Sequence, residues 1–238
     1  MSTLELHAVP PPRLLAPPRH TIVLAAAFVA MAIAGAVLQS RVSAHASAMP
    51  RPGQVLPLYA SLLAMEWGLV LYVWKAGLRR AGVSIREVVG GRWARPRDLA
   101  IDVAVALGVW GLWTLAGAGV DRWLGPAHAA SIATLLPRSP GEILLWIALS
   151  SSAGFCEELV FRGYFQSQLL ALTHRVGLAV VGQALLFGVS HGYQGVRACV
   201  AIAVYGLLLG ALARWRRSLR PGMLVHAWTD VAGGLFGW

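Results

Sequence analysis

Charged side chains are scarce in this sequence. Asp, Glu, Lys and Arg together make up 13% of the 238 residues, whereas 57% are hydrophobic. A water-soluble domain uses about 25% charged residues, and most of them lie on its surface. This chain has too little polar surface for a soluble globular fold, so its composition indicates a protein of the lipid bilayer.

Cysteine and acidic residues are also few. The two cysteines, Cys156 and Cys199, both lie in apolar segments, which argues against a disulfide framework and a cysteine-based metal site. We interpret both as small hydrophobic residues. The formal net charge is +10, because 20 Lys and Arg residues outnumber 10 Asp and Glu residues. The basic residues form short clusters and no continuous basic face, which argues against a nucleic-acid partner.

Long apolar runs dominate the rest of the chain. A spanning helix needs about 20 predominantly apolar residues, and several runs approach this length. Apolar residues occupy consecutive positions in each run, unlike the alternating pattern of a transmembrane β-barrel. We therefore expect an all-α fold, a polytopic transmembrane bundle of seven or eight helices, with spans near residues 21–38, 55–74, 100–120, 141–165, 176–191, 196–213 and 221–238.

The basic clusters predict how the helices are oriented. Lys and Arg concentrate in the cytoplasmic loops of membrane proteins, and here they concentrate in residues 75–99 and 214–220. Both loops are therefore predicted to be cytoplasmic, in a multi-pass protein of the cell membrane with its N-terminus inside and its C-terminus outside. The expected regions are a Pro-rich cytoplasmic tail at 1–20, N-terminal membrane helices over 21–140 that include the 75–99 loop, and a C-terminal helical region over 141–238.

Two acidic residues in the expected spans call for an explanation. A charge at the centre of a spanning helix costs about 2.5 to 3.5 kcal/mol on insertion scales. Asp102 begins the third span on the basic side, and we interpret it as an interfacial carboxylate near the arginines. Glu66 lies near the middle of the second span. It is either a structural partner for another polar group or a contributor to a functional site.

The fourth expected span concentrates charge in an apolar helix. Glu158 and Arg162 stand one helical turn apart and can form an ion pair, whereas Glu157 points about 100° away. A charge-compensated kink or a subunit contact would need only the pair. The additional glutamate therefore indicates a carboxylate that is available for chemistry.

Two later spans add imidazole groups. Glu157 and His191 are equidistant from a turn expected near position 174, so in an antiparallel hairpin both lie roughly 25 Å from that turn and can meet. His226 and Asp230 share one face of the seventh span. A satisfied core histidine and a local His–Asp hydrogen bond are the alternatives. Together the three spans supply a carboxylate base, histidines and groups that can stabilise negative charge, which is the chemistry of hydrolysis by an activated water.

These residues resemble the motifs of the CPBP family of intramembrane proteases. The family includes the CAAX prenyl endopeptidases of eukaryotes and the bacterial abortive-infection or bacteriocin self-immunity homologues. The resemblance covers roughly residues 141–238 and rests on the motifs Glu-Glu-x-x-x-Arg, Phe-x-x-x-His and His-x-x-x-Asn/Asp. In this sequence the motif residues are Glu157, Glu158 and Arg162; Phe187 and His191; and His226 and Asp230.

The resemblance implies a catalytic region over 141–238 and a role for each motif residue. Glu157 and His191 would activate the attacking water. His226 and Asp230 would form a pair that stabilises the oxyanion. The remaining two, which would orient the site, are Glu158 and Arg162.

The metal dependence of such a site stays open. The family has both a metal-dependent and a metal-free, glutamate-type interpretation. The sequence contains no His-Glu-x-x-His zinc motif, and we favour a site without a cofactor. The alternative is zinc or another divalent metal, with Glu157, His191 and His226 as its ligands.

The depth of the site in the membrane is ambiguous. If the turn near position 174 lies at the cytoplasmic surface, Glu157 lies about 25 Å from that surface, whereas His226 lies roughly 9 Å beyond Arg220. Either the hairpin of the fourth and fifth spans projects into the cytoplasm, or the seventh helix begins deeper. The resemblance to CAAX endopeptidases favours access from the cytoplasm.

We therefore predict an intramembrane endopeptidase whose partners are the lipid bilayer and a membrane-anchored protein or peptide substrate. Among its basic residues, 19 are Arg and one is Lys. This bias suits a GC-rich genome, and we expect a bacterial source and no prenylated CAAX substrate. Two alternatives are a transporter or ion pathway that uses the buried Glu, His and Asp groups, and a non-catalytic membrane scaffold. The sequence leaves the oligomeric state open.

Overall fold

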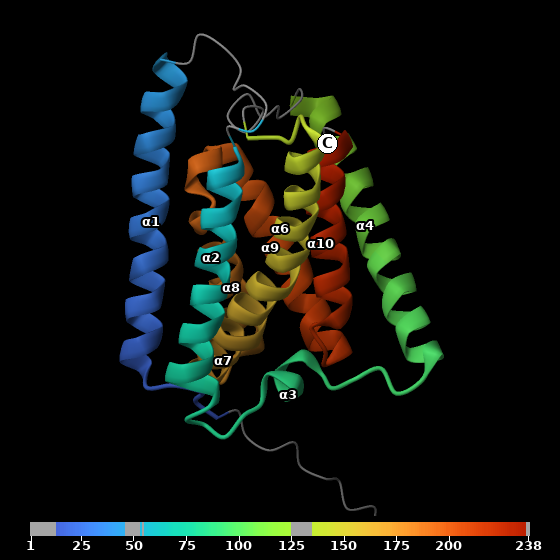
Figure 1. The fold of residues 1–238 in the computed structure, drawn as a ribbon. Coiled ribbons are helices and arrows are strands. Elements are labelled where there is room, and N and C mark those ends of the chain that lie inside the picture. The colour runs from blue at the N-terminus through green and yellow to red at the C-terminus, as the bar shows by residue number, and fades with distance from the viewer. Residues whose placement is uncertain (1–12, 46–52, 54, 125–134, 237–238) are drawn as a thin grey trace, which may run out of the picture.

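The computed structural model describes residues 13–45, 53, 55–124 and 135–236, and in these ranges the chain is helical without strands. Figure 1 shows the long helices side by side, which confirms the expected all-α membrane bundle. Most of the Pro-rich tail, residues 1–12, lies outside the described ranges. The α-helices are α1 (Pro18–His45), α2 (Leu56–Val73), α3 (Ile85–Val89), α4 (Pro96–Leu124), α6 (Pro140–Glu157), α7 (Gln166–Thr173), α8 (Val176–Ser190), α9 (Val196–Arg216) and α10 (Arg220–Phe236). The described ranges also contain two π-helical segments and one 3-10 turn, η1 (Trp74–Leu78), η2 (Glu158–Phe165) and η3 (Gly192–Gln194).

Fewer helices are long enough to span a membrane than the seven expected from sequence. Within the described residues, the helices that qualify by length and composition are Pro18–Leu38, Leu56–Leu78, Pro96–Gly119, Pro140–Thr173 and Val196–Arg216. The fifth and seventh expected spans correspond to α8 and α10, which have 15 and 17 residues. At 1.5 Å per residue these helices reach roughly 22 to 26 Å, short of a hydrocarbon core of about 30 Å. Both are held in the bundle by their neighbours, α8 by α9 and α10 by α6.

The fourth expected span is longer than predicted and has a π-helical middle. A capping box starts α6, in which the Ser139 side chain accepts a hydrogen bond from the backbone of Glu142 and the Glu142 side chain accepts one from the backbone of Ser139. The helix continues through η2 and α7 and ends at His174, whose left-handed φ of 54° makes the turn where the spacing predicts it. A π-helical segment inside an α-helix frequently marks a functional site. Here it begins at Glu158.

The two basic loops meet at one end of the bundle. The backbone N–H of Leu219 donates to the carbonyl of Val89 over 3.0 Å. The fully buried Asp102 pairs with Arg216 at 3.0 Å and with Arg220 at 3.2 Å. Asp102 therefore lies beside arginines, as predicted, and the loops expected on the same side of the membrane are in contact.

The start of α10 lies beside the π-helical segment η2. A Cβ at Gly163 would lie 3.3 Å from Leu219, and a Cβ at Gly222 would lie 3.0 Å from Glu158. The first residues of α10 therefore lie beside η2, and α7 continues beyond them to Thr173. Both alternatives made from sequence, the projecting hairpin and the deeper start of the last helix, are consistent with this arrangement.

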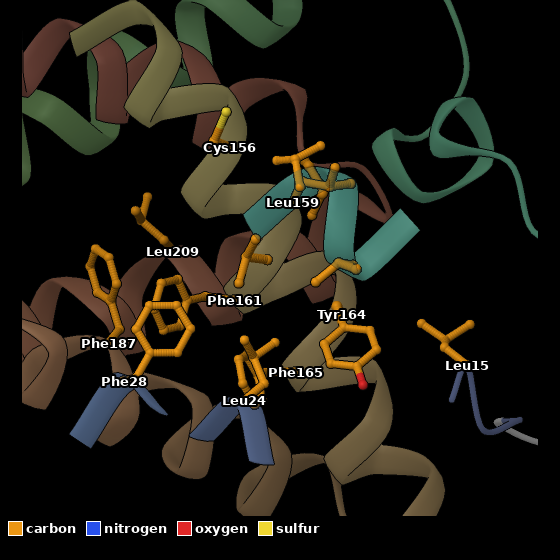
Figure 2. Packing of buried hydrophobic residues seen from close by; sticks show 14 of the residues in the cluster. Leu15, Leu24, Phe28, Cys156, Leu159, Phe161, Tyr164, Phe165, Phe187 and Leu209 are labelled. Atoms are coloured by element: carbon orange, nitrogen blue, oxygen red, sulfur yellow. The ribbon is translucent and has the colours of Figure 1, made fainter. Parts of the chain in front are cut away.

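Aromatic side chains fill the centre of the bundle (Figure 2). Phe161 of η2 packs against Phe28 of α1 and Phe187 of α8, with ring centroids 5.1 and 4.9 Å apart. Phe165 adds a contact to Phe28 at 6.0 Å. Lipid tails are as apolar as these rings, so close packing rather than removal from water holds the helices together. The cluster fixes α1 and α8 against η2.

Glycines let the helices that carry the motifs approach closely. A Cβ at Gly154 of α6 would lie 2.7 Å from the Cβ of Ala227 on α10. A Cβ at Gly188 of α8 would lie 2.5 Å from the carbonyl oxygen of Cys199 on α9. No larger residue fits at either position without moving a backbone, and small residues at such crossings are typical of membrane helices.

Candidate active site

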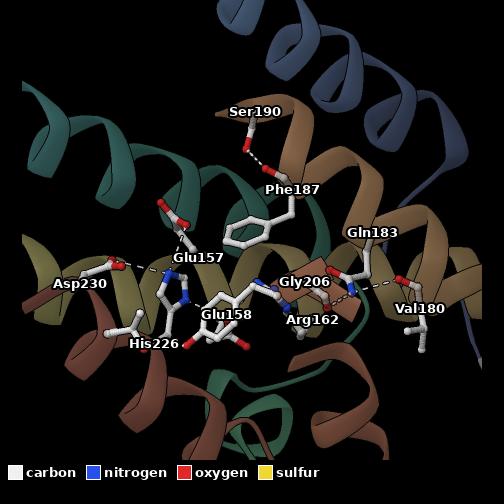
Figure 3. Close-up of polar contacts among 12 residues, drawn as sticks. Glu157, Glu158, Arg162, Val180, Gln183, Phe187, Ser190, Gly206, His226 and Asp230 are labelled. Carbon is white, nitrogen blue, oxygen red and sulfur yellow. Dashed lines mark hydrogen bonds and ion pairs between the residues drawn. The ribbon is translucent and has the colours of Figure 1, made fainter. Parts of the chain in front are cut away.

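Three buried polar side chains, linked one to the next, support the site from inside the bundle. Arg162 Nη1 lies 2.9 Å from Glu158 Oε1, and both side chains are fully buried. This is the ion pair predicted from the spacing. The same carboxylate oxygen lies 2.9 Å from His226 Nδ1 on α10 (Figure 3). Glu158 therefore links η2 to α10.

The contact with Glu158 determines how the His226 ring is used. A carboxylate that is paired with a guanidinium only accepts hydrogen bonds, so Nδ1 of His226 is the donor. The other ring nitrogen, Nε2, lies 3.7 Å from Glu157 Oε2 and 3.6 Å from Asp230 Oδ2. His226 is 4% exposed, so its ring is held in place and Nε2 is the atom it offers to the site.

The His191 ring is also held by hydrogen bonds at its Nδ1 atom. The residue caps the end of α8, where the backbone leaves the helix at φ −96° and ψ 22°. Its Nδ1 lies 2.8 Å from the carbonyl oxygen of Phe187 and 3.2 Å from the Ser190 hydroxyl. A carbonyl accepts and never donates, so Nδ1 carries a proton. The remaining Nε2 lies 4.0 Å from Glu157 Oε2.

Glu157 Oε2 is the atom on which the two imidazoles converge. It lies 3.7 Å from Nε2 of His226 and 4.0 Å from Nε2 of His191. These separations exceed a direct hydrogen bond, and among the described residues this buried oxygen has no hydrogen-bond partner. The Glu157 side chain is 24% exposed, compared with 0% for Glu158. Polar contacts of this length are typical of groups that share a water.

Phe187 packs against both histidines. Its ring meets the His191 ring edge to face at 4.9 Å and the His226 ring at 5.7 Å. The Arg162 guanidinium lies over the same ring, 4.2 Å from its centroid. The phenylalanine of the Phe-x-x-x-His motif thus fixes the angle of two imidazoles. The sequence signals this contact only through the spacing of Phe187 and His191, one helical turn apart.

Glu66 of α2 lies at the edge of the site. Its side chain is buried and lies beside Ser152 of α6, and it interacts electrostatically with Glu157 and Asp230. One carboxylate oxygen, Oε2, has no hydrogen-bond partner within the described chain. Both interpretations of Glu66 made from sequence are consistent with this position.

The metal alternative can be tested against the donor atoms. Its predicted ligands were Glu157, His191 and His226, whose donor atoms do face one another. However, the described residues include no group of three or more His, Cys, Asp or Glu side chains arranged to hold a metal ion. We therefore derive no step through a metal.

One comparison with known proteins gives a match. Residues 139–232 match the family model described as type II CAAX prenyl endopeptidase Rce1-like. This segment is Rce1-like. It contains all three motifs and runs from the cap of α6 into α10, which confirms the resemblance seen in the sequence.

The Rce1-like segment indicates a CAAX protease-like enzyme, in general terms an intramembrane endopeptidase with a membrane-associated peptide as its substrate. Together with the apolar helices, it indicates a multi-pass membrane protein. The helices α1 to α4 lie outside the matched residues. Neither the curated proteins nor the solved structures give a match.

Proposed function

We propose that the chain hydrolyses peptide bonds by a glutamate-type mechanism in which Glu157 is the general base. A water between Glu157 and His191 gives a proton to the Glu157 carboxylate and attacks the carbonyl carbon of the scissile bond. The tetrahedral intermediate collapses when the carbon–nitrogen bond breaks. The proton then passes from Glu157 to the departing amine, which leaves the carboxylate ready for the next turnover.

One observation supports this assignment most strongly. Glu157 Oε2 lies 3.7 and 4.0 Å from two imidazole Nε2 atoms, each on a ring whose Nδ1 is already engaged. These separations are too long for direct hydrogen bonds and suit a shared water. Because Nδ1 of His191 carries a proton, the Nε2 of its neutral form is an acceptor that can orient this water.

His226 and Asp230 are assigned to the negative charge that develops on the carbonyl oxygen. In its protonated form His226 donates from Nδ1 to Glu158 and from Nε2 into the site. That second donor would stabilise the oxyanion in a setting of low dielectric constant. Asp230, with Oδ2 3.6 Å from the same nitrogen, would keep the ring protonated and oriented.

Glu158 and Arg162 hold the other site residues in place and take no part in proton transfer. Their ion pair is fully buried, and Glu158 accepts a hydrogen bond from Nδ1 of His226. We assign them to orientation, because neither side chain is exposed to a substrate.

We further propose that the substrate is anchored in the membrane and enters from the cytoplasm. The end of the bundle where the two basic loops meet would be cytoplasmic, which also places the N-terminus inside. Because α10 begins beside η2, His226 lies only a few residues from this end. A bond just outside the membrane-anchored part of a substrate could then reach Glu157.

The test compares cells that express the wild type with cells that express Glu157→Gln. Mass spectrometry of terminal peptides in the membrane fraction would identify proteins cut only by the wild type, and a purified cut protein would then serve as substrate. Glu87→Gln is the matched control, because Glu87 lies on the exposed α3 and glutamine can also cap a helix. We expect Glu157→Gln to lose cleavage and Glu87→Gln to keep it. Identical sets of cut termini in wild type and Glu157→Gln would contradict the mechanism.

A further inference from the structure

The first helix contacts the site although it lies outside the Rce1-like segment. The three-residue turn η3 directly follows His191, and it packs against α1. The contact is close, because a Cβ at Gly192 would lie 3.1 Å from the carbonyl oxygen of Ala32. A Cβ at Gly35 would lie 3.3 Å from the Cβ of Tyr193. Bulkier residues at these positions would push η3 away from α1.

Tyr193 connects η3 to the candidate site. Its ring stacks on the His191 ring, with centroids 6.2 Å apart and an interplanar angle of 30°. Gln194 Nε2 donates to the Tyr193 hydroxyl oxygen over 2.9 Å. The Tyr193 side chain is also within electrostatic range of Glu157 and Asp230.

The two neighbours of the His191 ring restrict it in different directions. Phe187 meets the imidazole edge to face at an interplanar angle of 75°, whereas Tyr193 stacks on it. His191 ends α8, so no further helical turn supports its side chain. Without the stacked ring, only the Nδ1 hydrogen bonds and Phe187 would keep Nε2 directed at Glu157.

We propose that Tyr193 is a positioning residue for His191 and that α1 holds Tyr193 in place through Ala32 and Gly35. The first membrane helix is then part of the machinery that orients the water-activating histidine. The inference rests on the proposed function for its effect on catalysis. The placement of the ring itself can be measured without a substrate.

The first experiment measures the His191 ring directly. Diethyl pyrocarbonate modifies exposed imidazoles, and mass spectrometry gives the rate at His191 relative to the exposed His174. We expect Tyr193→Leu to raise the relative rate severalfold, because the stacked ring that covers one face is lost. Tyr193→Phe keeps the ring and should behave like the wild type. An unchanged rate in Tyr193→Leu would overturn the proposal.

Kinetics with a cleaved substrate give the second measurement. Tyr193→Leu should lower kcat about tenfold or more with little change in KM, since small displacements of a catalytic group are costly. Tyr193→Phe should restore kcat. A loss that Tyr193→Phe shares fully would assign the effect to the hydroxyl and contradict positioning by the ring.

Variants of α1 test whether this helix holds Tyr193 in place. Gly35→Val places branched carbon atoms against Tyr193 and should reproduce both effects of Tyr193→Leu. Ala34→Val is the control, because Ala34 is exposed on the same helix. If Gly35→Val matches Ala34→Val in labelling and kcat, α1 does not hold Tyr193.

A cross-link tests the α1–η3 contact independently of activity. A Cβ at Gly192 would lie 3.3 Å from the Ala32 Cβ, close to the separation of about 3.5 to 4.5 Å in a disulfide. The Ala32→Cys, Gly192→Cys pair should therefore oxidise readily, and the Ala34→Cys, Gly192→Cys pair should not. If the cysteine pair cross-links and Tyr193→Leu alters His191 labelling while the wild type cleaves no substrate, the placement is supported and the proposed hydrolysis is refuted. Absence of the cross-link would refute the placement.

Discussion

Glu158 and His226 lie 68 positions apart in the sequence and are joined by a 2.9 Å hydrogen bond between Oε1 and Nδ1. The same oxygen forms the ion pair with Arg162. One buried carboxylate thus sets the charge balance of η2 and the orientation of a histidine on α10. Substitutions can distinguish the two roles of Glu158, its charge pairing with Arg162 and its orientation of His226.

We predict that Arg162→Met strongly lowers the stability of the protein, because the ion pair that it breaks is buried. The variant leaves Glu158 buried without its guanidinium, and breaking a buried pair costs about 3 to 5 kcal/mol. The Glu158→Leu, Arg162→Met double variant removes both charges and should recover much of the lost thermal stability in detergent. It should remain inactive, because His226 loses its anchor. A double variant that cleaves normally would contradict the role given to Glu158.

We predict that Gly154→Val separates α6 from α10. The added Cβ would lie 2.7 Å from the backbone nitrogen of Ala227, and neither helix backbone can yield without moving Glu157 relative to His226. Overpacking of this kind costs typically about 1 to 3 kcal/mol. Gly233→Val is the control, because a Cβ there has open space. Melting temperature and cleavage should both fall for the first variant only; equal behaviour of the two would show that the crossing tolerates bulk.

The local geometry of the site could be predicted from sequence, because helical spacing fixes it. Glu158 and Arg162 pair as positions i and i+4 must, and the hairpin centred on position 174 brings His191 within 4.0 Å of Glu157. The His226 and Asp230 pair on one helix face follows from the same rule.

The contacts between distant helices could not be predicted, because spacing does not fix how one helix slides along another. The link from Glu158 to His226 depends on where α10 begins beside η2, and the sequence left two depths open. The packing of η3 on α1 depends on residues far apart in the chain, Ala32 and Gly192. The count of seven spans exceeds the five long apolar helices of the described residues because α8 is apolar but short and α10 has only 17 residues.

We predict that cleavage withstands removal of metal ions. The glutamate-type mechanism needs only Glu157, His191 and His226 around a water. Treatment of the purified protein with 1,10-phenanthroline, followed by dialysis, should leave kcat unchanged, and added zinc should not raise it. Loss of activity on chelation with recovery on adding one divalent metal would replace the proposed mechanism with a metal-dependent one.

We predict that Asp102→Asn loosens α4 from the start of α10. The Asp102 carboxylate is fully buried, pairs with Arg216 and Arg220, and accepts a hydrogen bond from Trp93 Nε1 at 2.8 Å. Its neutral replacement leaves two partly buried guanidinium groups without a counter-charge, which should lower stability by a few kcal/mol at most, since both are partly exposed. Asp98→Asn, four residues earlier in the first turn of α4, is the control. Equal melting temperatures for the two variants would show that the buried carboxylate does not hold α4 in place.

The last prediction concerns the pH dependence of α3, which supports the start of α10. Hydrogen bonds from Ser84 lower the pKa of Glu87, a capping-box residue on this exposed helix. A lowered folded-state pKa means that the ionised carboxylate stabilises α3 above the ordinary glutamate pKa. This stabilisation is lost as the pH falls through the lowered value.

Hydrogen exchange of the Ile85–Val89 amides provides the measurement. After correction for the intrinsic pH dependence of exchange, protection should fall on acidification in the wild type. In Ser84→Ala, which loses the side-chain half of the capping box, protection should be weaker throughout. In Glu87→Gln, which can still accept from the Ser84 backbone but does not titrate, protection should not depend on pH. Because the carbonyl of Val89 accepts hydrogen bonds from Leu219 N–H and the Ser218 hydroxyl, protection at the start of α10 should fall together with that of α3. If α3 loses protection while α10 keeps it, the two are not coupled through Val89.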